Sequence, residues 1–587
     1  MVWAALLIAQ SLESSQGPAG GLPALIASLT AALQNPLEVR WTDKSLLSIL
    51  SCTGVYIMAL ALWGAEHGRR REGAEHGSAA WASPRQVNAM FAQKENKILT
   101  RNVRLGLDTH KHRRSLNVLV IGGSGAAKTR SYVKPNILEA NTNYVVTDPK
   151  QEVLTATGGW LKQNGYEIRV LNLVNLEQSD GYNPFRYLRD EKDALKLVNN
   201  LIQATTPKGS HESDPFWTKA ETALLQAIIL MLFQEAPEYE QNFSMVMRVL
   251  EYAEVKEEDE EYISPLDLLF QAIEQDRPDS VAVRQYKVFK MAAGKTAKSI
   301  LISCGSRLAP FDIPQLREIM AYDELELDRI GDRKTAVFFT ISDTTPTYNF
   351  LVALAFSQMF NLLCERADSV HGGRLPHHVR VLWDEAANTG QVPQLEKLVA
   401  VIRSREVSLT LFYQQMAQCK AIYKDHAETI LGNMDSVIFL GGRESSTIKE
   451  ISENWLGKAT IYMQTDGRSK GQSESYNLNT QRLGRELMTP SELATMPGDK
   501  CILQLRGLPP FYSPKYDLKK HPNYKYTAEA DKQKNAFDLD KLINRRRRPG
   551  LSEVCEVYEA DAPDTAPIGE DEDILNYDDV DDPDAFV

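Results

Sequence analysis

The chain has 587 residues, of which 43% are hydrophobic, so it is long enough for two to four domains with packed cores. Its six cysteines are scattered without a C-x-x-C pair, which argues against a zinc module or a disulfide framework and favours reduced thiols. The net charge of −12 arises at the end of the chain, where residues 553–587 hold 14 acidic residues and no Lys or Arg. The net charge of the remaining residues is about +2, so the overall negative charge does not argue against nucleic-acid binding.

The first long apolar segment is Ser45–Gly64, which has 20 residues and no charged side chain. A helix of about 20 residues spans the roughly 30 Å hydrocarbon core of a bilayer. Arg69–Arg71 follow it, and the positive-inside rule places that side in the cytoplasm. Val2–Leu12 and Leu22–Leu33 are apolar but shorter. We expect one membrane span and leave a second open, with a buried soluble helix as the alternative for the first.

Residues 116–130 read LNVLVIGGSGAAKTR, an apolar run that predicts a strand and a Gly-rich turn close to the phosphate-binding pattern G-x-x-x-x-G-K-[ST]. Glycines let the backbone approach a ligand, and the N–H groups of the turn and of the helix start favour an anionic phosphate. Lys128 would reach the β- and γ-phosphates, and Thr129 would hold Mg²⁺. The predicted nucleotide-binding residues are Gly122, Gly123, Ser124, Gly125, Ala126, Ala127, Lys128, Thr129 and Arg130.

One position departs from this pattern. Ala127 stands where the second glycine is expected, and its methyl group adds bulk beside the phosphates. We expect it to be tolerated if the backbone there stays helical. A second Gly-Lys-Thr, at residues 294–296, has no strand before it and has Phe289 six residues before the lysine. It is therefore predicted to be an ordinary helix or loop.

Short β-type runs alternate with helical patterns after the phosphate loop, which predicts a doubly wound α/β sheet with ligands at the carboxyl ends of its strands. From about Asp190 to Asp332 the pattern is helical throughout and predicts an inserted all-α domain. The acidic run Glu257–Glu261 within it is read as a solvated loop, with a docking surface for a basic partner as the alternative. The predicted strands are Tyr144–Thr147, Glu167–Leu171, Thr335–Ile341, Val379–Trp383, Leu409–Tyr413 and Ser436–Leu440.

The run Val379–Trp383 ends in an acidic pair that can complete the site. Asp384 is predicted to hold Mg²⁺ through its water shell, and Glu385 to orient and deprotonate the attacking water. The alternative is a carboxylate pair that caps a helix start.

Arginines and a glutamine flank the next β-run. Arg403 and Arg405 precede it, and Gln414 follows it. In ring ATPases an arginine of one subunit often reaches the γ-phosphate of its neighbour and stabilises charge in the transition state. Gln414 fits the place of a phosphate sensor. Surface salt bridges are the alternative for both arginines.

Regular patterning fades after about Lys520. Arg545–Arg548 is read as a charged linker, with a contact to DNA or lipid headgroups as the alternative. The acidic end is rich in Asp, Glu and Pro and is predicted to be disordered.

Several short sequence motifs, taken in their order along the chain, resemble those of the type IV coupling proteins of conjugation and type IV secretion, the TraG-like ATPases. The resemblance covers about residues 76–520 and implies a membrane-anchored hexameric ATPase with a RecA-like nucleotide domain. The motifs are HGSAAWASP (76–84), GGSGAAKTR (122–130), VTDPKQE (146–152), YNPF (182–185), DPFWTKAE (214–221), WDEAANTGQVPQLEKL (383–398), the Gln414–Tyr423 segment, ILGN (430–433) and MTPSEL (488–493).

The resemblance also implies a domain plan. We expect a membrane anchor over 1–70, a nucleotide domain in two parts over 71–190 and 333–520, an all-α domain over 191–332, and a linker with a disordered acidic tail over 521–587.

The implied cofactors are ATP and Mg²⁺. The implied partners are a relaxase bound covalently to single-stranded DNA, the subunits of a type IV secretion channel, the cell membrane and further copies of the chain in a homohexamer. Asp148 and Lys150 match a family Asp-Pro-Lys motif, whose residues we interpret as structural support near the nucleotide. The implied catalytic residues are Lys128, Glu385, Arg405 and Gln414, and the implied metal-binding residues are Thr129 and Asp384. Arg405 matches the family's arginine better than Arg403 does.

Two other functions stay open. A nucleotide-binding docking receptor with little turnover would explain Ala127. A segregation-type translocase of double-stranded DNA is also a membrane-tethered P-loop hexamer, but the end of this chain lacks a winged-helix pattern and is acidic instead.

Overall fold

The computed structural model describes residues 2–14, 22–34, 39–67, 73–206, 215–256, 262–292, 294–342, 347–469 and 475–544. The predictions for Glu257–Glu261, Arg545–Arg548 and the acidic tail lie outside these residues. Two compact units emerge, one formed by residues 1–168, 206–209 and 327–536, the other by 169–205, 210–326 and 537–587. The five cysteines among the described residues are free thiols.

The described part of the chain contains a nine-stranded mixed sheet with the order β13-β12-β9-β3-β8-β7-β4-β6-β5. The strands from β9 to β6 are parallel neighbours, and β12 is antiparallel to both β9 and β13. Because β3 is central, the chain extends the sheet on both of its sides, which confirms the predicted doubly wound α/β fold. The strands are β3 (Val118–Ile121), β4 (Asn143–Thr147), β5 (Glu167–Asn172), β6 (Thr335–Thr340), β7 (Val379–Trp383), β8 (Val407–Tyr413), β9 (Ser436–Phe439), β12 (Lys500–Leu505) and β13 (Phe511–Pro514).

The central strands are apolar on both faces because helices cover both sides of a parallel sheet. Every residue of β3, β4, β6, β7 and β8 is buried. Helix α15 packs on this core through Phe356, whose ring contacts those of Phe339 and Trp383. The helices of this unit's body are α4 (Pro84–Phe91), α5 (Thr109–His112), α6 (Lys134–Leu138), α7 (Glu152–Gln163), α15 (Asn349–Ser369), α16 (Leu395–Val401), α17 (Met416–Tyr423), α18 (His426–Gly432), α19 (Ser445–Glu450), α20 (Pro490–Ala494) and α21 (Lys532–Asn535).

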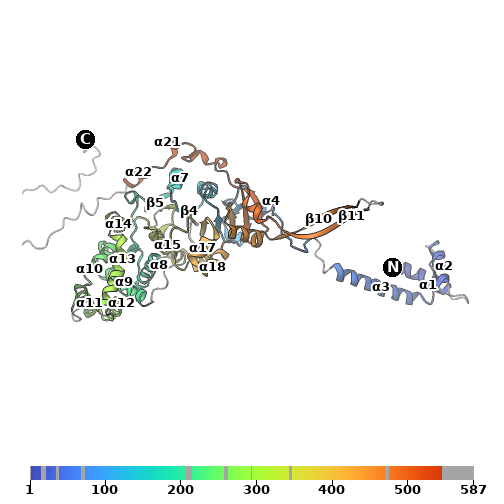
Figure 1. Cartoon of the computed structure of the whole chain (residues 1–587), viewed down its shortest axis with the longest axis horizontal. Helices are drawn as coiled ribbons and strands as arrows, with labels where there is room; N and C mark the ends of the chain where they lie inside the picture. The colour runs from blue at the N-terminus through green and yellow to red at the C-terminus, as the bar shows by residue number, and fades with distance from the viewer. Residues whose placement is uncertain are drawn as a thin grey trace, which may run out of the picture. The chain divides into compact units, whose positions relative to one another are not determined.

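Two smaller strand pairs were not predicted. β1 (Asn96–Ile98) pairs with β2 (Arg104–Gly106). β10 (Lys458–Ser469) and β11 (Ser475–Glu486) form a long antiparallel ribbon (Figure 1). The ribbon is anchored at its base, where Ser78 bridges to Ala459.

The segment after Lys520 was predicted to be a linker, but residues 521–536 belong to the first unit. The Tyr526 ring stacks on Trp160 at 4.6 Å, and the His521 imidazole contacts the Glu139 carboxylate at 2.9 Å. Polar and aromatic side chains hold this segment rather than an apolar periodicity, so its sequence shows no regular pattern.

The second unit begins before the predicted boundary at 191 because the preceding loop packs within it. The Tyr182 N–H donates to the Ile319 carbonyl at 2.7 Å, and the Asn183 amide donates to the Ala321 carbonyl. Arg307 of α13 joins Glu221 of α9 at 2.8 Å and donates to the Ile202 carbonyl of α8. The helices of this unit are α8 (Glu191–Thr205), α9 (Pro215–Glu235), α10 (Phe243–Glu251), α11 (Pro265–Asp276), α12 (Val281–Lys290), α13 (Gly294–Leu308), α14 (Pro314–Ile319) and α22 (Leu539–Asn544).

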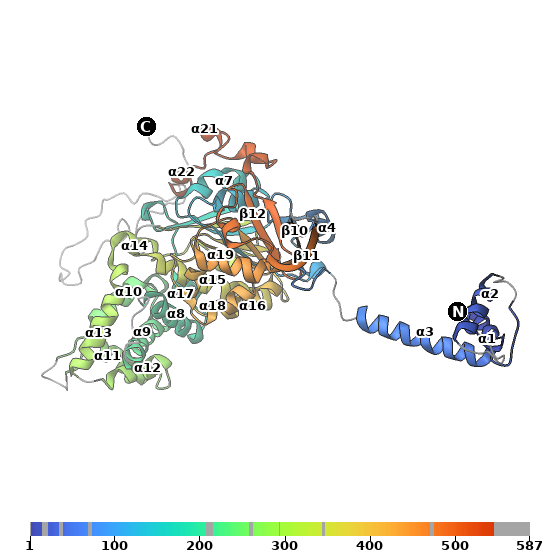
Figure 2. The same cartoon turned by 45° about the vertical axis from the view of Figure 1, so that its right-hand side comes forward.

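The N-terminal segment is helical. Figure 2 shows α1 (Val2–Ser14) and α2 (Leu22–Gln34) beside the longer α3 (Ser45–His67). The window Ser45–Ala65 has a mean hydropathy of 2.0 and is 11% buried. At about 1.5 Å per residue, α3 is long enough to cross a bilayer, whereas α1 and α2 are not. Helices α9 and α15 are also long and apolar, but 67% and 72% of their windows are buried in protein.

Candidate active site

The Gly-rich turn after β3 forms a cradle at the carboxyl edge of the sheet. A Cβ at Gly122 would lie 2.9 Å from the Ala126 Cβ, so a larger residue does not fit there. Gly125 has a φ of +75°, a conformation that glycine adopts readily. A helical segment then starts at Thr129, with η1 (Thr129–Val133) leading into α6. The N–H groups of Gly123 and Ala126 donate to the carbonyls of Gly441 and Gly123, so the other N–H groups of the turn are the ones available to an anion.

The backbone at Ala127 is not right-handed helical, so the condition under which the alanine was expected to be tolerated is not met. Its φ is +64°, in the left-handed region. This conformation costs an alanine roughly 1–2 kcal/mol because its Cβ crowds the following carbonyl. The turn keeps the shape that glycine would give it, so the substitution adds backbone strain as well as a methyl group.

Lys128 and Thr129 both line the cavity formed by the turn. The Lys128 side chain is 9% exposed, and its ammonium donates to the Gly122 carbonyl at 3.1 Å. The Thr129 hydroxyl donates to the Asp384 carboxylate at 3.1 Å. Two hard oxygen donors beside a phosphate cradle suit Mg²⁺, which binds few protein groups and keeps several waters. The residues present therefore fit a magnesium nucleotide.

The acidic pair follows β7, two strands from β3. Burial raises the pKa of Asp384 to about 6, and the nearby Lys128 ammonium opposes this shift. The Glu385 carboxylate lies 3.6 Å from the Lys128 ammonium and accepts a hydrogen bond of 3.3 Å from the Gln414 amide. Glu385 has a φ of +50° and does not start a helix, so the helix-cap alternative is not supported.

Asp148, which directly follows β4, lines the same cavity as Lys128 and Asp384. Its Oδ2 accepts the backbone N–H groups of Val153 and Leu154 at 2.9 and 2.8 Å. Its Oδ1 is buried and has no hydrogen-bond partner among the described residues. Burial raises the pKa of Asp148 to about 7. Asp148 thus places one carboxylate oxygen beside the cradle, while its other oxygen accepts N–H groups from the first turn of α7.

These residues line one cavity of about 1130 Å³ that opens to solvent. Sequence reasoning did not single out Glu152 and Asn388, although both lie within stretches that resemble the family, residues 146–152 and 383–398. The cavity is lined by Gly123, Ser124, Gly125, Ala126, Ala127, Lys128, Thr129, Arg130, Asp148, Pro149, Lys150, Glu152, Asp384, Glu385, Asn388 and Gln414.

Arg403 and Arg405 do not line this cavity. Arg405 precedes the amino end of β8, whereas Gln414 follows its carboxyl end. A strand of seven residues is about 23 Å long, so the two residues lie at opposite edges of the sheet. The Arg405 guanidinium instead pairs with the Asp368 carboxylate at 2.7 Å. Within one chain, Arg405 therefore cannot reach the phosphate cradle.

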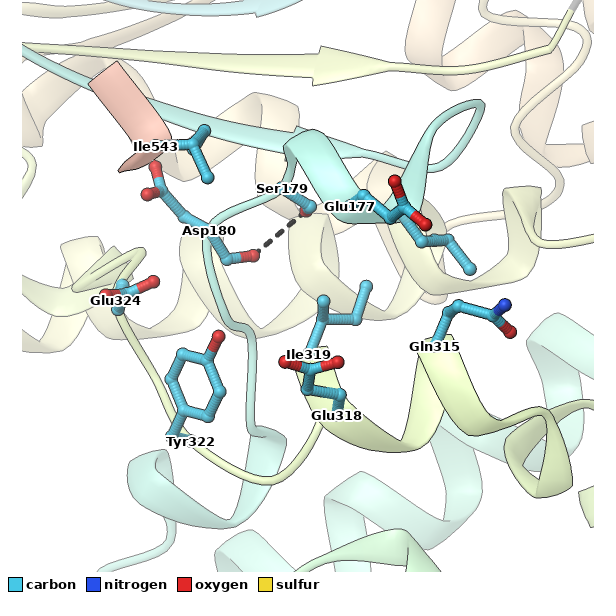
Figure 3. A pocket seen from close by; sticks show the side chains of 10 residues that line it. Glu177, Ser179, Asp180, Gln315, Glu318, Ile319, Tyr322, Glu324 and Ile543 are labelled. Atoms are coloured by element: carbon cyan, nitrogen blue, oxygen red, sulfur yellow. Dashed lines mark hydrogen bonds between the residues drawn. The ribbon is translucent and has the colours of Figure 1, made fainter. Parts of the chain in front are cut away.

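The second Gly-Lys-Thr is ordinary, as predicted, because Gly294 begins α13 and the preceding element is α12. A separate pocket in the second unit, of about 490 Å³, also lacks features of a phosphate site (Figure 3). Its carboxylates include Asp180 and Glu324, which accept the N–H groups of Val170 and Gly181. These acids hold the local backbone and would repel a phosphate.

Comparisons with known proteins place the chain in a family and identify structures that share its fold. A family model described as Type IV secretory system Conjugative DNA transfer matches residues 78–537. Conjugal transfer protein TraG of Rhizobium radiobacter is 22% identical over 402 residues, which cover 67% of this chain and 60% of that protein. Type IV secretion system-coupling protein VirD4 of Bartonella henselae is 22% identical over 410 residues, 68% of this chain and 62% of that protein. The matched region thus spans less than two thirds of either relative.

Solved structures of the plasmid coupling protein TrwB share the fold. The complex of TrwB with the ATP analogue ADPNP has a TM-score of 0.55 at 16% identity and covers 76% of this chain and 96% of that one. The complex with ADP and Mg²⁺ has a TM-score of 0.53 at 16% identity and covers 75% and 94%. At such identities the likeness establishes a TrwB-like α/β fold.

Proposed function

The chain belongs to the type IV secretory system conjugative DNA-transfer family, the coupling proteins of conjugation and type IV secretion, and from this premise we propose that it is a membrane-anchored ATPase. It couples ATP hydrolysis to the delivery of relaxase-bound single-stranded DNA into a secretion channel. The observation that carries this proposal is the approach of the Thr129 hydroxyl to the Asp384 carboxylate beside the phosphate cradle.

ATP and Mg²⁺ are the proposed cofactors. The N–H groups of Gly125 and of residues 127–129 would hold the phosphates, and Thr129 and Asp384 would hold the metal, which neutralises phosphate charge when it is bound. TrwB, which shares the fold, was solved with ADPNP and with ADP and Mg²⁺. Arg130 also lines the cavity, and its guanidinium lies 3.4 Å from the Glu529 carboxylate.

Glu385 is the proposed base. In the structure its carboxylate contacts the Lys128 ammonium and accepts a hydrogen bond from the Gln414 amide. A γ-phosphate attracts Lys128 more strongly than one carboxylate does, since it carries more charge. Glu385 would then be free to accept a proton from water, while Gln414 senses the phosphate.

Arg405 is proposed to act on a neighbouring subunit. Its position at the opposite end of β8 from the cradle excludes a role in its own site. In a ring, the same arginine can instead be supplied in trans to the site of the neighbouring subunit. This role requires the proposed homohexamer and the release of Arg405 from Asp368.

The remaining parts of the proposal concern partners. Helix α3 is the proposed membrane anchor, and the helical second unit is the proposed inserted all-α domain. The relaxase, its single-stranded DNA and the subunits of the secretion channel are the proposed partners.

The test is ATP hydrolysis by the full chain in lipid nanodiscs with Mg²⁺ and single-stranded DNA. Lys128→Ala should abolish turnover, because the ammonium that contacts the phosphates is removed. Lys295→Ala is the matched control, since it alters the same tripeptide outside the site. Equal turnover by the natural chain and Lys128→Ala would reject the assigned site.

A docking receptor with little turnover is the second candidate, and the left-handed Ala127 favours it. Tight binding of Mg-ATP and of relaxase without hydrolysis would support this function over the motor.

A further inference from the structure

One lysine outside the motif contacts the phosphate loop where the loop is strained. We propose that Lys515 is a positioning residue that holds the peptide between Ala126 and Ala127, so that an alanine can occupy a position that favours glycine. This inference rests on the proposed nucleotide binding. The carrying contact is a hydrogen bond of 3.0 Å from the Lys515 ammonium to the Ala126 carbonyl, across 389 residues of sequence.

The geometry links this bond directly to the strained torsion. The Ala126 carbonyl and the Ala127 N–H belong to one planar peptide unit. The φ of Ala127, +64°, is the rotation about the bond that joins this unit to the Ala127 Cα. A change to right-handed backbone therefore swings the Ala126 carbonyl away from Lys515 and breaks the hydrogen bond.

The peptide on the other side of Ala127 is also held. The Ala127 carbonyl accepts the Ser131 N–H at 2.8 Å and the Ser131 hydroxyl at 2.6 Å. Ser131 lies in the helical segment after the loop, so this side is fixed locally. Lys515 supplies the corresponding restraint on the side where the loop has no helix.

Lys515 is well placed for this role. It directly follows β13, and its own N–H donates to the Asp499 carbonyl at 2.7 Å, which fixes its backbone. Its side chain is half-buried, and burial lowers its pKa from the ordinary value. Among the described residues the Lys515 ammonium forms no ion pair with a carboxylate. The acceptor of its hydrogen bond is the Ala126 carbonyl.

The consequence concerns the N–H groups of the cradle. In the left-handed conformation the peptides around Ala127 direct their N–H groups toward a bound phosphate. Loss of Lys515 would let the alanine relax, and the loop would have to be reordered by the nucleotide itself. Affinity for the nucleotide would fall, while the chemical step on bound ATP would change little.

A double-mutant cycle tests this. Binding of a fluorescent ADP analogue with Mg²⁺ is measured on the full chain in nanodiscs, with Lys515→Met introduced into the natural chain and into Ala127→Gly. We expect Lys515→Met to weaken binding about tenfold in the natural chain and less than about threefold in the Ala127→Gly background, because glycine needs no restraint. Lys515→Arg should retain most of the affinity.

The control is Lys520→Met, which removes the same charge from an exposed position in the same segment and should leave binding unchanged. In ATPase assays Lys515→Met should raise KM and leave kcat nearly unaltered. Equal losses in both backgrounds, or no loss in either, would overturn the role of Lys515 while nucleotide binding by the natural chain stands. A natural chain that binds no nucleotide would instead sink the proposed function and this inference together.

Discussion

The Thr129 hydroxyl and the Asp384 carboxylate are joined by a hydrogen bond of 3.1 Å, although 255 residues separate them in the sequence. The sheet brings them together, because β3 and β7 are parallel strands with only β8 between them. Their carboxyl ends meet at one edge, where ligands of doubly wound folds bind. A phosphate loop and a carboxylate that share one magnesium ion require this arrangement.

Magnesium binding should depend on pH. Burial raises the pKa of Asp384 to about 6, so its neutral form is favoured below that pH and cannot bind a cation well. Affinity for Mg-ADP should therefore rise as the pH increases through about 6. Titration calorimetry on the natural chain between about pH 5.5 and 8 measures this. Asp384→Asn should bind Mg-ADP weakly and with a flatter pH profile; the same slope in both proteins would contradict the assignment.

Glu385→Gln should separate binding from chemistry. The amide keeps the size of the side chain but cannot accept a proton, so turnover should fall by about 10²–10⁴. Binding should persist or strengthen, because Lys128 loses its carboxylate partner at 3.6 Å and is free for phosphate. Steady-state hydrolysis and nucleotide binding are measured on the same preparation. Hydrolysis at the natural rate would show that another group activates the water.

The proposed role of Arg405 can be tested by mixing subunits. Arg405→Ala and Lys128→Ala chains should each be inactive alone, since an arginine supplied in trans is worth about 10³–10⁵ in rate. Co-assembled, an intact cradle from one chain can meet Arg405 from the other, so hydrolysis should return. Asp368→Asn, which breaks the 2.7 Å ion pair but keeps the arginine, should remain active. Absence of recovery in mixed assemblies would leave Arg405 as a structural ion pair.

The sequence predicted those features that depend on short segments. The strand before the Gly-rich turn and the apolar run before Asp384 are buried β-strands with polar residues at their carboxyl ends, and such runs are recognisable without a structure. Gln414 could be located for the same reason, because it follows the buried β8. The cradle and its acidic partner could therefore be assigned from pattern alone.

Features that depend on distant contacts could not be predicted. The contact of Lys515 with the phosphate loop joins residues far apart in the chain, and neither side carries a motif for it. The left-handed φ of Ala127 is likewise set by its surroundings, since local preference opposes it. The same holds for Glu529, which pairs with Lys134 at 2.8 Å from a segment without apolar periodicity.

The second unit should depend on a buried ion pair. The side chains of Arg307 and Glu221 are 14% and 6% exposed and lie 2.8 Å apart, and Arg307 also donates to the end of α8. Arg307→Ala leaves a buried carboxylate without its partner and should cost about 3–5 kcal/mol of unfolding free energy. Urea unfolding measures this, with Lys196→Ala, which loses an exposed pair, as the control. A change below about 1 kcal/mol would mean that water replaces the arginine.

Stimulation by DNA should distinguish the proposed motor from a duplex translocase. Contacts between a protein and phosphates release counterions, so binding weakens steeply as salt rises. We expect single-stranded DNA to stimulate hydrolysis by the full chain in nanodiscs, with the DNA concentration for half stimulation rising at least about tenfold between about 50 and 200 mM salt. Duplex DNA of equal length should stimulate less, and Glu385→Gln should show no stimulation because it lacks the base. Stronger stimulation by duplex DNA would favour a double-stranded translocase, since both substrates present the same phosphate chemistry and differ in shape.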